Sequence, residues 1–412
     1  MKRTPKKCVL LIIDGLGDLP IPELSGKTPL EGANTPVLDR LATAGAIGLV
    51  DPVGPSVVPN THSGTGLLFG VYPSDVGHIH RGPVEAAGAG HFLEPGEIAL
   101  RVNFATLEDR SQGLKIIDRR AGRITAETRL LAAALADLDL GDGIRARLWA
   151  TDQHRGVLLL TGPGLDGAVS DTDPGDRGAS EFVLEARPGR SEANLTARKV
   201  NRFVTEAHRL LSGHPLNAGR IKRGLLPANG ILTRGAGAGF HLPHLLDDRQ
   251  IATALVAGCN TVRGMGRILG FKVIRDARFT ADAATDLDAK MGSALAALER
   301  CQMVYLHVKA PDIFSHDRQP QGKRDFIERL DRAMAALEGQ GALIALAADH
   351  TTDSNSGKHT ADPVPALIHD PDEAPSRPAA PVDFGETACR NGSLPRQSAH
   401  EFLLTLLKQM GY

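Results

Sequence analysis

Short apolar runs, each followed directly by polar residues, recur along the chain. The clearest lie at residues 8–13, 303–308 and 342–347. Runs of this length that do not alternate with polar positions are typical of strands buried on both faces of a parallel sheet. Residues 287–298 and 327–337 instead carry apolar side chains at helical spacing. This pattern predicts an α/β fold, with a mostly parallel sheet flanked by helices.

Helix ends can be predicted at two places. Thr35 and Pro36 are a suitable N-cap and first helical residue, and Gly45 a suitable stop. Ser398 and Glu401 have the spacing of a capping box that opens a terminal helix.

A third helix start concerns a possible anion site. Residues 59–62 are expected in a loop, and residues 67–69 at the opening of the next helix. The N-terminus of a helix that follows a strand attracts anions, because its backbone N–H groups are free.

The pattern of apolar and polar residues in the middle of the chain differs from that at its two ends. It contains strand-like runs such as 98–104 and one long amphipathic helix pattern at 192–211. A chain of 412 residues is longer than a single core usually supports. We therefore expect an inserted α+β substrate-capping domain at residues 96–228, within a core formed by residues 1–95 and 229–412.

Composition narrows the class of protein. Hydrophobic residues make up 42%, charged residues 23% and aromatic residues 4%, with a formal net charge of -1. No basic block predicts a nucleic-acid partner, no apolar stretch predicts a membrane partner, and the start lacks a signal-peptide pattern, so a cytoplasmic location is expected. The four cysteines show no CxxC spacing and are expected to be buried free thiols rather than metal ligands or disulfides. No feature predicts an oligomeric state.

The polar residues after the apolar runs have the chemistry of metal ligands. Since the carboxyl ends of parallel strands meet at one sheet edge, we expect these residues to converge. The set is Asp14, Thr61, Asp312, His316, Asp349, His350 and His359. Mixed carboxylate and imidazole groups suit Mn or Zn better than Mg, and seven groups suit two ions. Thr61 is the candidate nucleophile, because a metal-bound hydroxyl loses its proton more readily.

Each of these residues also has an ordinary interpretation. An aspartate at a strand end often caps a helix, and a single threonine in a loop is often a turn residue. Ser63 is a rival to Thr61 as nucleophile, two positions further on. Placement at strand ends, taken jointly, favours the metal site.

A family resemblance runs almost from end to end. Its motifs include Leu11-Ile-Ile-Asp-Gly-Leu-Gly-Asp18, Gly26-Lys-Thr-Pro-Leu-Glu31, Arg81-Gly-Pro-Val-Glu-Ala-Ala-Gly-Ala-Gly90, Asp118-Arg-Arg-Ala-Gly-Arg123, Ser170-Asp-Thr-Asp-Pro174 and Arg223-Gly-Leu-Leu-Pro-Ala-Asn229. With these motifs the chain resembles the archaeal-type, 2,3-bisphosphoglycerate-independent phosphoglycerate mutases of the alkaline phosphatase superfamily. The resemblance implies an alkaline-phosphatase-like core and an isomerase that interconverts 3-phosphoglycerate and 2-phosphoglycerate. It also implies two divalent metal ions and no 2,3-bisphosphoglycerate.

The resemblance also assigns roles to residues. It implies one metal on Asp14, Thr61, Asp349 and His350, and the other on Asp312, His316 and His359. It places Arg263 on the transferred phosphate. It implies substrate contacts from Arg119, Arg120, Arg123, His154 and Arg155, although each arginine could equally form a surface salt bridge. Asp171 and Asp173 are the candidate acid/base groups.

The chain departs from the family at the nucleophile. The family pattern is close to Gly-Ser-Asp-Val-Ala-His, whereas this chain has Asn60-Thr-His-Ser-Gly-Thr65. Threonine keeps a hydroxyl, so a phospho-threonine intermediate is expected. The alternatives are a phosphatase, phosphotransferase or phosphonate-metabolite enzyme that acts on another small phosphorylated metabolite, and a binding protein whose site is inactive.

Overall fold

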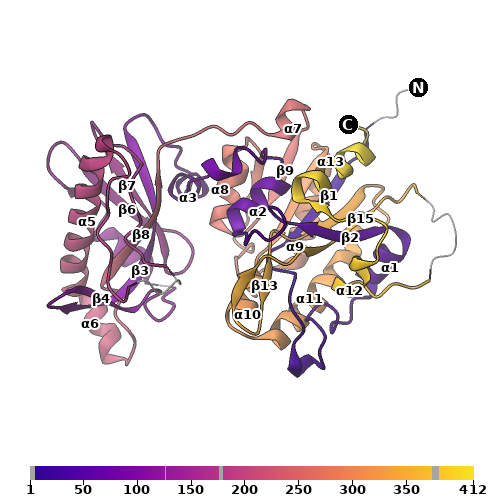
Figure 1. Cartoon of the computed structure of the whole chain (residues 1–412), viewed down its shortest axis with the longest axis horizontal. Coiled ribbons are helices and arrows are strands. Elements are labelled where there is room, and N and C mark those ends of the chain that lie inside the picture. Colours follow the sequence, from indigo (N-terminus) through magenta and orange to yellow (C-terminus); the bar gives the residue numbers. More distant parts are fainter. Residues whose placement is uncertain (1–4, 126, 176–179, 374–379) are drawn as a thin grey trace. The chain divides into compact units, whose positions relative to one another are not determined.

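The computed structural model describes residues 5–125, 127–175, 180–373 and 380–412. The chain forms two compact units, coloured along the sequence in Figure 1. The first comprises the residues up to Ile79 together with Leu242–Tyr412, and the second comprises His80–His241.

An eight-stranded sheet forms the centre of the first unit. In spatial order its strands are β10 (Lys272–Ile274), β9 (Thr253–Val256), β11 (Met303–Val308), β1 (Cys8–Ile13), β12 (Leu343–Ala347), β15 (Val364–His369), β2 (Ala46–Asp51) and β16 (Gln397–Ser398). Only β15 runs antiparallel to its neighbours. The three central strands β11, β1 and β12 are buried along their whole length, as expected for strands covered on both faces. The predicted mostly parallel α/β sheet is confirmed.

The helices of the first unit follow the predicted pattern in most places. They are α1 (Pro36–Ala44), α2 (Thr61–Leu68), α7 (Leu245–Asp248), α8 (Asn260–Ile268), α9 (Leu287–Leu298), α10 (Ala310–His316), α11 (Pro320–Met334), α12 (Glu386–Arg390) and α13 (Ala399–Met410). The predicted start of α1 at Pro36 is confirmed, although the Thr35 side chain makes no capping hydrogen bond. The predicted capping box of Ser398 and Glu401 is present at α13.

The predicted helix opening at residues 67–69 is wrong. Helix α2 begins at Thr61 and ends at Leu68. Asn60 causes this early start, because its side chain accepts a hydrogen bond from the Ser63 backbone N–H while the Ser63 hydroxyl accepts one from the Asn60 N–H. Thr61 is therefore the first residue of a helix and not a loop residue.

The second unit is built on an antiparallel sheet. Its strands are β4 (Gly113–Asp118), β3 (Glu97–Arg110), β7 (Arg155–Thr161), β6 (Arg145–Ala150) and β5 (Leu138–Asp139), in that order, and β8 (Gly230–Gly237) also pairs with β3. Its helices are α3 (Arg81–Ala89), α4 (Thr128–Ala133), α5 (Asn194–Ser212) and α6 (Pro215–Lys222). Phe104 and Phe203 lie in its main hydrophobic core.

This unit is wider than the predicted insert at residues 96–228. Strand β8 completes its sheet, since Val102 of β3 lies opposite Thr233 of β8. A boundary at residue 228 separates β8 from that partner, and a boundary at residue 96 leaves out α3.

Two further expectations concern cysteines and membranes. Cys8, Cys259, Cys301 and Cys389 are all buried and free, as predicted. Within the described part of the chain, none of the helices combines the length and the apolar character that a membrane crossing requires. The Pro- and Ala-rich stretch at residues 371–381 predicts a surface loop, and it lies partly outside the described residues.

Candidate active site

The ends of the central strands bring the predicted ligands of the first unit together. Strands β1 and β11 run parallel, with Ile13 opposite Val308, so that Asp14 and Lys309 follow at the same sheet edge. Strand β12 lies on the other side of β1 and leads to Asp349 and His350. The predicted convergence of these distant residues is therefore present.

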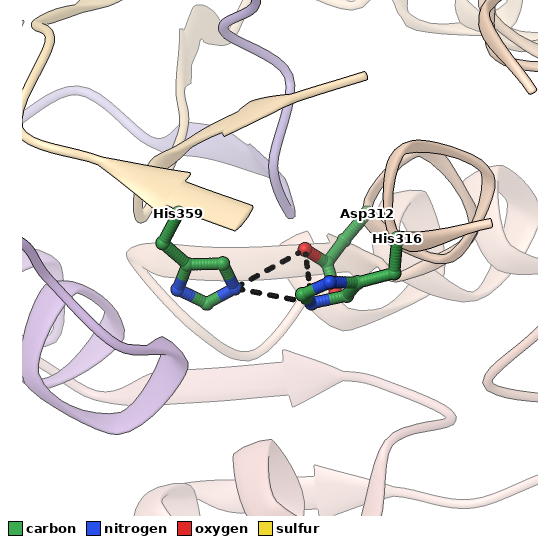
Figure 2. Close-up of side chains that lie close together, drawn as sticks. All are labelled: Asp312, His316 and His359. Carbon is green, nitrogen blue, oxygen red and sulfur yellow. Dashed lines mark hydrogen bonds and ion pairs between the residues drawn. The ribbon is translucent and has the colours of Figure 1, made fainter. Parts of the chain in front are cut away.

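Asp312, His316 and His359 form one ligand group (Figure 2). The Asp312 Oδ1 atom lies 3.4 Å from His316 Nε2 and 3.5 Å from His359 Nε2, and the two Nε2 atoms are 3.2 Å apart. Ligand atoms about 2.1 Å from a tetrahedral metal ion lie about 3.4 Å from one another. The triangle therefore has the dimensions of one face of a metal coordination sphere.

Backbone carbonyls orient the two histidines of this group. His316 Nδ1 donates to the Gly357 carbonyl at 2.8 Å, and His359 Nδ1 donates to the Pro59 carbonyl at 3.0 Å. Because a carbonyl only accepts, these bonds place a proton on Nδ1 and leave the Nε2 lone pair of the neutral ring for a metal ion. Such an arrangement is usual for histidine ligands of metals.

Asp14, Asp349, His350 and Thr61 form a second cluster of candidate ligand atoms. Around the His350 Nε2 atom lie Asp14 Oδ1 at 3.2 Å, Asp349 Oδ2 at 3.4 Å and Thr61 Oγ1 at 3.4 Å. Asp14, Asp349 and His350 are fully buried. The other ring nitrogen of His350 lies 2.9 Å from the Thr352 hydroxyl, which itself donates to Asp312 Oδ1 at 2.9 Å. His350 Nε2 therefore also faces the site with its lone pair.

The start of helix α2 positions the candidate nucleophile. Thr61 is the first residue of the helix, at the end where the helix dipole favours an anion. The Ser63 hydroxyl donates to the Asn60 carbonyl and takes part in the cap, so the geometry favours Thr61 over this rival. Gly64 lets the helix approach Asp349 closely, since a Cβ atom there would lie 1.9 Å from the Asp349 carbonyl oxygen.

The three buried carboxylates differ in charge. Burial opposes ionisation, but Lys309 and neighbouring histidines outweigh it and lower the pKa values of Asp14 and Asp312. Burial and the negative charge of Asp14 together raise the pKa of Asp349 well above its usual value. Without bound cations, the surroundings therefore favour the ionised forms of Asp14 and Asp312 and disfavour that of Asp349.

Three residues of this site were not predicted. His307 Nε2 lies 3.1 Å from Asp14 Oδ2, Lys309 Nζ lies between Asp14 and Asp312, and Thr352 links His350 to Asp312. Two sequence signals were available. His307 interrupts an otherwise apolar buried strand, and Lys309 follows the end of that strand directly.

The position of Arg263 fits an anion contact. It lies on helix α8, which contacts α2, and its Nη2 atom donates to Asn260 Oδ1 at 3.2 Å. Its buried Nε has no hydrogen-bond partner among the described residues. A buried donor without a partner is costly, and an oxyanion would satisfy it.

The second unit holds an arginine-rich group. It contains the predicted residues Arg119, His154 and Arg155, together with Arg81, Arg101 and Arg234, which were not predicted. Burial and nearby Arg155 lower the pKa of Arg101 to about 9. Burial and the same arginine lower the pKa of His154 to about 2, so that this imidazole is neutral. Among the described residues, the buried atoms Arg101 Nε, His154 Nδ1 and Arg155 Nε lack a hydrogen-bond partner.

The two candidate acid/base residues have different environments. Asp173 is buried and held by Arg119 Nε at 2.9 Å and Arg234 Nε at 2.7 Å. Burial opposes its ionisation, but Arg119 and Arg234 lower the pKa of Asp173. Asp171 is exposed and accepts one hydrogen bond, from the Gly235 N–H at 2.7 Å. Asp173 is thus held between two arginines, whereas Asp171 is open to solvent.

The predicted residues Arg120 and Arg123 are exposed and flank the buried Ala121 on a strained turn. Ala121, Gly122 and Arg123 have consecutive positive φ angles of 47°, 65° and 58°. The left-handed conformation costs a non-glycine residue about 1 to 2 kcal/mol. The turn holds the two arginines beside His154, whose pKa both of them lower.

These features together indicate a class of enzyme. A hydroxyl at a helix start, beside two groups of carboxylates and imidazoles at the carboxyl edge of an α/β sheet, is the arrangement expected of a metal-dependent phosphoryl-transfer enzyme.

Comparisons with known proteins identify the family. A family model described as 2,3-bisphosphoglycerate-independent phosphoglycerate mutase matches residues 42–217. Proteins with that name from Ignicoccus hospitalis and Methanopyrus kandleri are 39% and 38% identical to this chain. The alignments cover 94% of both chains in the first case, and 97% of this chain and 96% of the relative in the second.

Solved structures agree with these relatives. A cofactor-independent phosphoglycerate mutase from Thermoplasma acidophilum is 30% identical, with a TM-score of 0.65, over 99% of this chain and all of that one. A Pyrococcus horikoshii protein is 29% identical, with a TM-score of 0.78, over 99% of this chain and 97% of that one. The chain belongs to the 2,3-bisphosphoglycerate-independent phosphoglycerate mutase family.

Proposed function

We propose that this protein interconverts 3-phosphoglycerate and 2-phosphoglycerate by metal-dependent phosphoryl transfer through phospho-Thr61. Family membership over nearly the whole chain supports the reaction. The observation that carries the mechanism is the Thr61 hydroxyl, 3.4 Å from His350 Nε2 at the start of helix α2. The Thr65 hydroxyl also lies beside a proposed ligand, but it is fully buried and donates to Asp349 Oδ2 at 3.4 Å, whereas Thr61 is only half-buried.

The donor atoms fit two divalent ions, Mn or Zn in preference to Mg. One ion would be held by Asp14, Asp349, His350 and Thr61, and the other by Asp312, His316 and His359. When bound, such a pair supplies a lowered hydroxyl pKa and positive charge for the phosphoryl oxygens. The mixed carboxylate and imidazole chemistry and the Nε2 lone pairs that face the site support this assignment.

The side chains of the first unit then prepare the transfer. The Thr61 oxygen attacks phosphorus in line with the departing glycerate oxygen, and the start of helix α2 stabilises the added negative charge. Arg263 can donate to a phosphoryl oxygen through its unsatisfied Nε. Threonine is stiffer than serine about χ1, so the attacking oxygen is held in few orientations.

The second unit would bind the glycerate. Its arginines suit a carboxylate, because guanidinium groups pair with carboxylates in a bidentate manner. Among the described residues, the buried Nε atoms of Arg101 and Arg155 have no hydrogen-bond partner. The neutral imidazole of His154 can accept a hydrogen bond from a hydroxyl or donate one to it. Asp171 would carry the proton between the two glycerate hydroxyls.

Phosphorus NMR of 3-phosphoglycerate with metal-reconstituted protein tests this function. We expect 2-phosphoglycerate to appear, to be absent with Thr61→Ala and to persist with Thr61→Ser, which keeps the hydroxyl. Release of free phosphate alone would replace the mutase by a phosphatase. If Thr61→Ala remained active and Ser63→Ala did not, the nucleophile would be Ser63.

A further inference from the structure

Lys309 joins the two ligand groups of the first unit. Its Nζ atom lies 2.8 Å from Asp14 Oδ1 and 2.6 Å from Asp312 Oδ2, and its side chain is 8% exposed. Asp14 belongs to one ligand group and Asp312 to the other. A single buried ammonium group therefore pairs with a carboxylate of each group.

The two contacts of Lys309 differ in which oxygen they occupy. Asp312 uses Oδ2 for Lys309 and turns Oδ1 toward His316 and His359. Asp14 instead uses the same Oδ1 atom for Lys309 and for the approach to His350 Nε2, while its Oδ2 atom faces His307. Lys309 thus leaves the metal-facing oxygen of Asp312 free and occupies that of Asp14.

This difference has opposite consequences for cations at the two groups. An ion between Asp312, His316 and His359 does not compete with the ammonium for an oxygen. An ion on Asp14 Oδ1 would lie beside the ammonium, and the repulsion between two close positive charges is strong at a buried site. Without ions, however, the ammonium balances carboxylates whose burial unpaired would be costly.

We propose that Lys309 is a positioning residue that imposes an order on metal loading. The Asp312, His316 and His359 group fills first and more tightly, and the Asp14 group fills second, as the ammonium releases Asp14 Oδ1. The same residue stabilises the metal-free protein. This inference rests on the proposed two-metal site.

Titration calorimetry with Mn²⁺ and thermal unfolding of the metal-free protein test the proposal. The wild type should bind two ions with separate affinities. Lys309→Met, which has a similar length and no charge, should tighten the weaker step about tenfold or more and lower the metal-free Tm. An unchanged or weakened second step in folded Lys309→Met would overturn the proposal.

Lys323 offers a matched control. It is likewise a buried lysine of the first unit and pairs with Asp18 at 2.8 Å, and no contact with a proposed ligand is found for it among the described residues. Lys323→Met should lower the Tm and leave both Mn²⁺ affinities unchanged. A tightened second step in this variant as well would mean that the loss of any buried lysine has this effect, and would overturn the specific role of Lys309.

Two ligand variants assign the order without any change at Lys309. His359→Ala should lose the tighter Mn²⁺-binding step, and Asp349→Asn should lose the weaker one. The reverse result would overturn the proposed order. This test does not depend on whether Lys309→Met folds. If the wild type bound no Mn²⁺ or Zn²⁺ at all, the metal site itself would be wrong. Two equal, independent sites in the wild type would overturn only the role of Lys309.

Discussion

The acidic site of the first unit and the arginine-rich group of the second balance their charges in different ways. In the first unit, one lysine and the proton expected on Asp349 compensate carboxylates that lie within a few ångströms of one another. In the second, Asp173 pairs with Arg119 and Arg234, but Arg101 has other arginines as neighbours and the Glu85 carboxylate 3.9 Å away. The first group therefore has unused capacity for cations, and the second for an anion.

Loss of a metal ligand should have the largest effect. Replacing His316 by alanine removes one corner of the ligand triangle, so we expect kcat to fall about a thousandfold or more at ordinary metal concentration. Steady-state kinetics and metal analysis of the purified variant check this. The exposed His78 is the control position, and His78→Ala should remain fully active. Full activity of His316→Ala would remove this residue from the site.

Substitutions of the two acid/base candidates of the second unit, Asp171 and Asp173, should have different effects. Asp171→Asn should lower kcat about 10² to 10⁴-fold with little change in stability, because it removes a proton carrier. Asp173→Asn should mainly lower the free energy of unfolding, by about 3 to 5 kcal/mol, because it leaves Arg119 and Arg234 without their carboxylate. Kinetics and urea unfolding of both variants distinguish these roles. An exchange of the two results would make Asp173 the proton carrier.

Substitutions in the arginine-rich group should change KM more than kcat. Arg155→Ala removes one charge-assisted contact, so we expect KM to rise roughly 10 to 100-fold, about 1.5 to 3 kcal/mol. Arg145, exposed and paired with Asp137 in the same unit, is the control, and its alanine variant should behave as the wild type. If Arg155→Ala lowered kcat with KM unchanged, Arg155 would contact the transition state rather than the bound substrate.

The close approach of helix α2 to Asp349 can be disturbed by one methyl group. In Gly64→Ala the new Cβ atom would overlap the Asp349 carbonyl oxygen, so the helix must shift. We expect a loss of about 1 to 3 kcal/mol in the free energy of unfolding, together with a lower kcat, since Thr61 lies on that helix. Gly77→Ala, which meets no atom within 4 Å, is the control. An unchanged kcat in Gly64→Ala would show that the position of α2 is not critical.

The smallest effect concerns a carboxyl outside both groups. Burial raises the pKa of Glu386 from 4.5 to about 7, although Thr28 Oγ1 donates to it at 2.6 Å. Because the folded protein holds this proton more tightly, Glu386 lowers stability progressively as the pH rises from 4.5 to 7. Glu386→Gln should remove this loss. Since the side chain is only half-buried, we expect a gain of about 1 to 2 kcal/mol at pH 8.

Urea unfolding of both proteins across this range provides the test. The difference between Glu386→Gln and the wild type isolates this carboxyl, because all other titrating groups are common to both. A difference that does not depend on pH would show that Glu386 ionises normally in the folded protein.

The first unit was the more predictable from sequence, for a physical reason. Apolar runs that are followed within a few residues by Asp14, Asp312 or Asp349 specify both the strands and the edge at which they meet. The start of α2 was missed, because Thr-His-Ser-Gly-Thr-Gly has low intrinsic helix propensity, and the cap at Asn60 determines the boundary instead.

The second unit depended on pairings that a local pattern does not reveal. Asp173 pairs with Arg234 of strand β8, which lies beyond the predicted boundary at residue 228, so this contact could not be predicted. Arg101 lies in the middle of β3, and its neighbours are known only once the sheet is assembled. In an antiparallel sheet with distant partners, the same residue pattern is compatible with a salt bridge or with a ligand contact.

The carbonyl bonds that hold His316 and His359 bear on how such a site evolves. A backbone carbonyl is present whatever side chain its residue carries, so Pro59 and Gly357 can orient these rings without specifying the surrounding sequence. The loop that leads to Thr61 can accumulate substitutions while the imidazole beneath it stays in place. The orientation of both rings therefore depends on the path of the backbone at residues 59 and 357 and not on the side chains carried there.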